Sequence, residues 1–233
     1  MDLIPHMRFV LLIIVAFFIS GCSPENVRSF DIRNLAKSDI DMVADTHRKE
    51  LETQIRKLTI KLYKRNPREL AKTPRMTIDL RVQQILAPPP SEGYPELEGR
   101  SGAKAMSLAL TESYQGDRVF ALMAGVHSMI DASFNNKREF FLLDELDQQK
   151  LYNSARNLET VAWNLNNRKD RHGQLLLLSN GYSKEGIPNL SFERTLGKMI
   201  ALQDMLAMII ADTTNRTIKN VVHRAASFTF LPI

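Results

Sequence analysis

The chain has 233 residues, 44% of them hydrophobic and 24% charged, an ordinary globular composition that excludes disorder along the whole length. Its formal net charge of +5 falls short of the dense basic surface of a nucleic-acid binder, so we expect no nucleic-acid partner. A single cysteine, Cys22, excludes an intramolecular disulfide and a cysteine-rich metal site.

The first residues follow the pattern of an export signal. Arg8 precedes eleven apolar residues, 9 to 19, and small residues come next. This run is shorter than the roughly 20 apolar residues of a membrane span, and its charged, apolar and small segments have the order of a signal peptide. We therefore predict a signal peptide over residues 1 to 21. Translation could begin at Met1 or at Met7, since a basic residue follows Met7 directly.

The end of this leader, Ile19-Ser20-Gly21-Cys22, resembles the lipobox of bacterial lipoproteins. The resemblance implies that the Cys22 thiol receives a diacylglycerol, that the leader is cut before Cys22, and that the freed amine is acylated. Acyl chains stabilise membrane attachment by about 0.8 kcal/mol per buried methylene. Ser23 stands where Asp is the usual signal for inner-membrane retention, so the resemblance favours the outer membrane, facing the periplasm. We expect no cofactor apart from this covalent lipid.

The lipidated cysteine and a flexible tether occupy residues 22 to 37, and a helical domain follows over residues 38 to 233. Ser38 is a predicted N-cap with Asp41 three residues later, and apolar residues then recur at steps of three and four up to about Asn66. Pro67 begins a short helix over residues 68 to 72. Thr73-Pro74 predicts a further helix start, with a strand as the alternative because apolar residues alternate over residues 76 to 82.

The rest of the chain is also predicted to be helical. A Pro/Gly-rich connection over residues 87 to 102 is the best candidate for a boundary, and helices follow over residues 103 to 114 and 117 to 134. Asp147 begins the next helix, residues 169 to 190 form a loop, and Ser191 caps a last helix that reaches residue 226 and is the longest. The sum is an all-α fold, an irregular antiparallel bundle of about six helices with little or no strand.

Two segments outside the leader add a weaker resemblance. Lys-Leu-Tyr-Lys-Arg-Asn-Pro-Arg-Glu-Leu, residues 61 to 70, and the ending Phe-Leu-Pro-Ile are similar to segments of proteobacterial lipoproteins that have no assigned activity. This resemblance implies an envelope protein but no mechanism.

A basic segment is the first candidate site. Residues 48 to 75 hold ten Lys or Arg against three Glu, a net charge of +7. Four of these cations recur at helical spacing and would share one face if the register continues past Pro67: Lys57, Lys61, Lys64 and Arg68. Such a face is either a solvated surface or a contact for anionic head groups.

A stripe of asparagines is the second candidate. Asn153, Asn157, Asn164 and Asn167 recur along the helix that begins near Asp147, although asparagine is a poor helix former. They form either a solvated face or a polar seam that pairs with another helix, a glycan or a peptide.

The sequence carries no recognised catalytic motif, and we interpret the protein as a non-enzymatic, membrane-anchored lipoprotein that binds a protein or anionic lipid partner in the envelope. The alternatives are a cell-wall or lipid hydrolase and a glycan- or peptide-binding module. A closed cleft with convergent polar side chains would favour these alternatives, and exposed apolar side chains would favour a partner surface.

Overall fold

The structure, a computed structural model, describes residues 37–141, 144–183, 185–219 and 229–233. The predicted signal peptide, Cys22 and the tether up to residue 36 lie outside the described residues. Within the described ranges, no helix combines the length and the apolar character that a membrane span requires.

The described residues form a helical bundle, which confirms the predicted all-α class. Its seven helices are α2 (Asp39–Arg65), α3 (Pro67–Leu70), α4 (Ile78–Leu86), α5 (Gly102–Ala109), α6 (Arg118–Ser133), α7 (Gln148–Asn167) and α8 (Ser191–Thr214). A 3-10 turn, η2, covers Pro95–Leu97. The strands of the described part, β1 (Gly181–Tyr182) and β2 (Pro188–Asn189), pair antiparallel in a hairpin.

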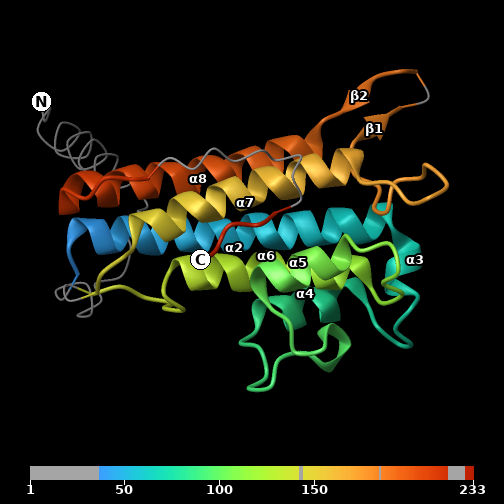
Figure 1. The fold of residues 1–233 in the computed structure, drawn as a ribbon, viewed down its shortest axis with the longest axis horizontal. Helices are drawn as coiled ribbons and strands as arrows, with labels where there is room; N and C mark the ends of the chain where they lie inside the picture. Colours follow the sequence, from blue (N-terminus) through green and yellow to red (C-terminus); the bar gives the residue numbers. More distant parts are fainter. Residues whose placement is uncertain (1–36, 142–143, 184, 220–228) are drawn as a thin grey trace, which may run out of the picture. The chain divides into compact units, whose positions relative to one another are not determined.

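The long helices run side by side, with α7 and α8 on one side of α2 and α5 and α6 on the other (Figure 1). Side-chain pairs fix their directions. Arg156 of α7 contacts Asp204 of α8 and Asn166 contacts Glu193, so α7 and α8 are antiparallel. Arg48 contacts Asp131 and Tyr63 contacts Asp117, so α2 and α6 are antiparallel as well.

Helix α6 lies at the centre of the core. Its residues 119 to 123 and Val126 are fully buried, as expected for a helix that is apolar nearly all round. The absence of a side chain at Gly125 allows α5 to pack closely on α6, because a Cβ there would lie 2.9 Å from the backbone oxygen of Gly102. A buried polar contact joins three helices, since Gln203 of α8 donates to Ser133 of α6 and Ser154 of α7.

Several helix starts agree with their sequence signals. Ser38 and Asp41 form a reciprocal capping box at the start of α2. Asp117 accepts from the backbone N–H of Phe120, and Asp147 caps α7. These caps depend on residues within three positions of each other, so local sequence suffices to predict them.

Other boundaries were predicted wrongly. Helix α4 begins four residues after Pro74, because Thr77 provides the cap while Thr73 accepts from Arg81. The predicted strand alternative over residues 76 to 82 is therefore also wrong. Helix α5 ends at Ala109 rather than near residue 114, because Arg118 binds the backbone carbonyls of that segment.

The last helix also differs from its prediction. Ser191 is its first residue, and the side chain of Asn189 accepts from the Ser191 N–H. The helix ends at Thr214 because Asn215 takes the left-handed conformation that asparagine tolerates. The 27-residue α2 is therefore longer than the 24-residue α8. Residues 220 to 226, where the last helix was expected to end, lie outside the described residues.

Candidate functional site

The predicted basic face divides into parts with different surroundings. Lys57 and Lys64 are exposed on α2. Lys61 points to α8, where its ammonium donates to the backbone oxygen of Ser191 and, at 3.2 Å, to Thr195. It also lies 4.8 Å from the ring centroid of Phe192. Lys61 therefore helps to hold α8 on α2.

The helical register does not continue to Arg68. Asn66 has non-helical backbone angles and separates α2 from α3. Arg68 keeps 59% of its side chain exposed while it donates to the backbone oxygen of Leu176 at 3.3 Å. The four predicted cations therefore do not share one helical face, because three lie on α2 and Arg68 lies on α3.

Arg194, from a distant part of the sequence, lies close enough to Lys61 to affect its charge. Burial, and then the positive charge of Arg194 on α8, lower the pKa of Lys61. Arg194 itself is exposed. We call the group Lys57, Lys61, Lys64, Arg65, Arg68 and Arg194 the cationic end. Sequence reasoning missed Arg194 because only the packing of α8 on α2 brings it here.

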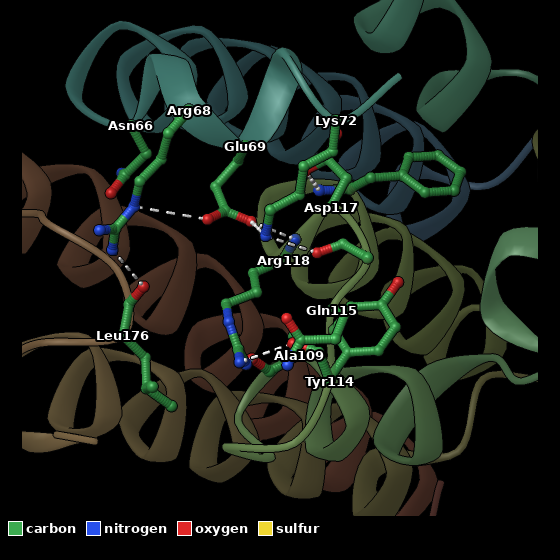
Figure 2. A network of polar contacts seen from close by, with 12 residues as sticks. Asn66, Arg68, Glu69, Lys72, Ala109, Tyr114, Gln115, Asp117, Arg118 and Leu176 are labelled. Carbon is green, nitrogen blue, oxygen red and sulfur yellow. Dashed lines mark hydrogen bonds and ion pairs between the residues drawn. The ribbon is translucent and has the colours of Figure 1, made fainter. Parts of the chain in front are cut away.

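A buried polar network lies next to Arg68, around the start of α6 (Figure 2). The Glu69 carboxylate accepts from the backbone N–H of Arg118 at 2.8 Å and from Lys72 at 2.7 Å. The Asp117 carboxylate accepts from the Tyr63 hydroxyl at 2.8 Å. Two carboxylates thus lie at the positive end of the α6 dipole, which stabilises them there.

The buried environment of this network raises the pKa values of Asp117 and Tyr63. Burial raises the pKa of Asp117, although hydrogen bonds from the Phe120 backbone and Tyr63 oppose the shift. Burial and the neighbouring Asp117 raise the pKa of Tyr63 well above its usual range. A neutral Tyr63 donating to Asp117 is therefore the stable arrangement across physiological pH.

Arg118 binds the backbone of the segment that connects α5 to α6. Its guanidinium donates to the backbone oxygens of Ala109, Thr111, Glu112 and Tyr114, at distances of 2.6 to 2.9 Å. Carbonyls at the end of α5 and in the following turn would otherwise lack helical partners. The network therefore fixes the connection between α5 and α6. Among the described residues, no group of three or more His, Cys, Asp or Glu is placed to hold a metal ion.

The asparagine stripe is largely buried. Asn157 is fully buried, Asn164 and Asn153 are 1% and 8% exposed, and Asn167 is exposed. The solvated-face interpretation is therefore wrong for the first three, and Asn167 lies apart from them. We call Asn153, Asn157 and Asn164 the polar seam.

The C-terminal residues of the chain occupy part of the polar seam. Asn157 donates to the backbone oxygen of Leu231 at 3.0 Å and accepts from its N–H at 2.7 Å. Asn153 donates to the oxygen of Pro232 at 2.9 Å. Phe230 and Ile233 pack on the core beside these bonds. The seam thus binds the chain's own backbone, a role that local sequence could not reveal.

No protein-family model matches this chain, and searches of the curated proteins and of the solved structures gave no match.

Replacing Asn157 with Ala should lower the free energy of unfolding by about 1–2 kcal/mol, because the partly buried N–H and oxygen of Leu231 would lose their partner. Urea denaturation of the chain from Ser23 onward measures this change. Asn167→Ala is the matched control, since its side chain bonds only locally to the Trp163 oxygen and should change stability by less than about 0.5 kcal/mol. Equal effects of the two substitutions would contradict the role of the seam.

Proposed function

We propose that the protein is a non-enzymatic bacterial lipoprotein, anchored through a lipid on Cys22 in the outer membrane and facing the periplasm. We further propose that its helical domain binds anionic lipid head groups. The cationic end carries this second proposal. Exposed Lys57 and Lys64 lie there with Arg65, Arg68 and Arg194, and within the described part of the chain neither lysine has an acidic partner.

The dimensions of the chain support contact with the membrane that holds the anchor. Helix α2 has 27 residues and is therefore about 40 Å long. Cys22 precedes Lys37, the first described residue, by 15 positions, and 15 residues span at most about 50 Å when extended. The tether is thus long enough for the far end of α2 to reach the same membrane.

Electrostatics favours such contact. Each Lys or Arg close to an anionic membrane contributes about 1 kcal/mol, and this attraction fades within a Debye length of about 8 Å at physiological salt. Several cations at one end of the bundle would orient the domain as well as attract it. The polar seam does not support the glycan- or peptide-binding alternative, because the chain's own C-terminal residues fill part of it.

The anchor is tested by replacing Cys22 with Ala in the bacterium. We expect the wild-type protein to fractionate with membranes and to have the mass of an acylated chain beginning at Cys22. The variant should accumulate as unprocessed precursor, because the lipid acceptor is the thiol. Its thermal unfolding should not change, since Cys22 precedes the compact unit that begins at Lys37. A wild-type mature chain without acyl mass would refute the anchor.

The head-group site is tested by flotation of the unlipidated chain from Ser23 onward with vesicles of equal parts phosphatidylglycerol and phosphatidylcholine. Replacing Lys57, Lys64 and Arg68 together with Gln should weaken binding by tenfold or more, at about 1 kcal/mol per charge. Lys61 stays unchanged because it bonds to α8. Arg68 contacts Leu176 and Glu69, so circular dichroism must show that the variant keeps its helix content.

The control variant replaces Lys49, Arg100 and Lys104 with Gln, which removes the same charge from exposed positions elsewhere. It should bind nearly as well as the wild type. Binding of the wild type should also fall as salt rises. Equal losses in the two variants, or binding that does not depend on salt, would show that the cationic end is only a solvated surface.

A further inference from the structure

The β1–β2 hairpin exposes an unusual set of apolar side chains. It projects beyond the ends of the helices (Figure 1). The large apolar residues exposed on it and beside it are Leu178 at 40%, Tyr182 at 78%, Ile187 at 64% and Leu190 at 52%. Four such residues lie within 13 positions of the chain, whereas single exposed apolar residues need no explanation.

Side-chain hydrogen bonds hold the base of the hairpin. Asn66, 1% exposed, donates to the backbone oxygen of Leu178 at 2.8 Å and accepts from its N–H at 2.7 Å. Asn180 donates to Asn166 of α7 and to Glu193 of α8. The exposed side chains are therefore presented from a base fixed on α2, α7 and α8, which lowers the entropy cost of binding through them.

Three cations of the cationic end, Lys61, Arg65 and Arg194, lie near this base. The guanidinium of Arg65 lies so close to β1 that a Cβ on Gly181 would be 2.6 Å from its nitrogen. Lys61 bonds to the backbone of Ser191, directly after Leu190, and Arg194 follows within one helical turn. Acidic groups nearby include Glu185 in the turn of the hairpin and Glu193, which accepts from Asn166 and Asn180. Glu69, which is buried, lies 3.6 Å from Arg68.

We propose that the hairpin inserts Tyr182 and Ile187 into the interfacial region of an anionic bilayer while the cations at its base contact head groups. This inference rests on the proposed function, because the lipid anchor keeps the domain beside a membrane. An apolar tip suits the acyl region of a bilayer surface, and the flanking Lys and Arg suit its anionic head groups. Tyrosine favours the boundary between these two regions. The flanking charge is what favours an anionic bilayer over an apolar protein surface.

A fluorescent label can report the insertion directly. The chain from Ser23 onward contains no cysteine, so Ile187→Cys creates a single site for the environment-sensitive dye NBD. Met205→Cys on α8 is the matched control, because Met205 is an apolar side chain with 52% exposure away from the hairpin. We expect vesicles of equal parts phosphatidylglycerol and phosphatidylcholine to blue-shift and strengthen the emission at position 187 and to leave position 205 unchanged.

A second variant separates insertion from simple attraction. Replacing Tyr182 and Ile187 together with Ser removes exposed side chains only, so the fold should persist, and vesicle affinity should fall about tenfold. The pair Met205→Ser and Met208→Ser removes a similar apolar surface elsewhere and should bind as the wild type does.

The outcomes distinguish this inference from the proposed function. Salt-dependent binding without a spectral change at position 187, and with full affinity in the Tyr182 and Ile187 variant, would overturn the insertion and leave the head-group site in place. Absence of binding to these vesicles would overturn both. Binding to pure phosphatidylcholine with the same affinity would overturn the role of the cations and leave only apolar insertion.

Discussion

The position of the proposed binding surface depends on one buried side chain, Asn66. Its amide donates to the backbone oxygens of Leu62 and Leu178 and accepts from the N–H of Leu178. Asn66 lies between the end of α2 and Pro67, which begins α3. Its amide joins this junction to the base of the hairpin. Without the Asn66 amide, the N–H and the oxygen of Leu178 would each lose a partly buried hydrogen bond worth about 1 kcal/mol. The amide of Asn66 thus sets where the hairpin lies relative to the cations of α2.

The same physical constraint explains much of the remaining architecture. Buried ends of helices and turns must find hydrogen-bond partners, and here polar side chains supply them. Arg118 binds four carbonyls at the end of α5 and in the following turn, Ser128 accepts from the N–H of Gly102 at the start of α5, and Asn157 binds the backbone of the C-terminal residues. These buried polar groups serve the fold. The proposed membrane contact instead uses exposed groups, namely the cations around the end of α2 and the apolar side chains of the hairpin.

Local signals in the sequence predicted the all-α class and the starts of α2, α6 and α7, because a cap and the stripe that follows it lie within a few turns. They could not predict that Lys61 would bond to α8, since Ser191 is 130 positions away. The bonds of Asn66 to Leu178 and of Asn157 to Leu231 could not be predicted either, because the partners are 112 and 74 positions apart. The hairpin has strands of two residues each, too short for any periodic pattern. The stripe of asparagines was a better signal of a long-range contact than the basic segment, because buried asparagines in a helix require hydrogen-bond partners.

In the proposed function, the lipid anchor, the cationic end and the hairpin would together hold the domain on its membrane in one orientation. Hydrogen–deuterium exchange of the chain from Ser23 onward, with and without anionic vesicles, tests this orientation most directly. Vesicles should slow exchange over residues 57 to 68 and over the hairpin up to residue 194, while exchange in α6 and the first half of α7 stays unchanged. Protection confined to the opposite end of the bundle, near the start of α2 and the end of α8, would contradict the account.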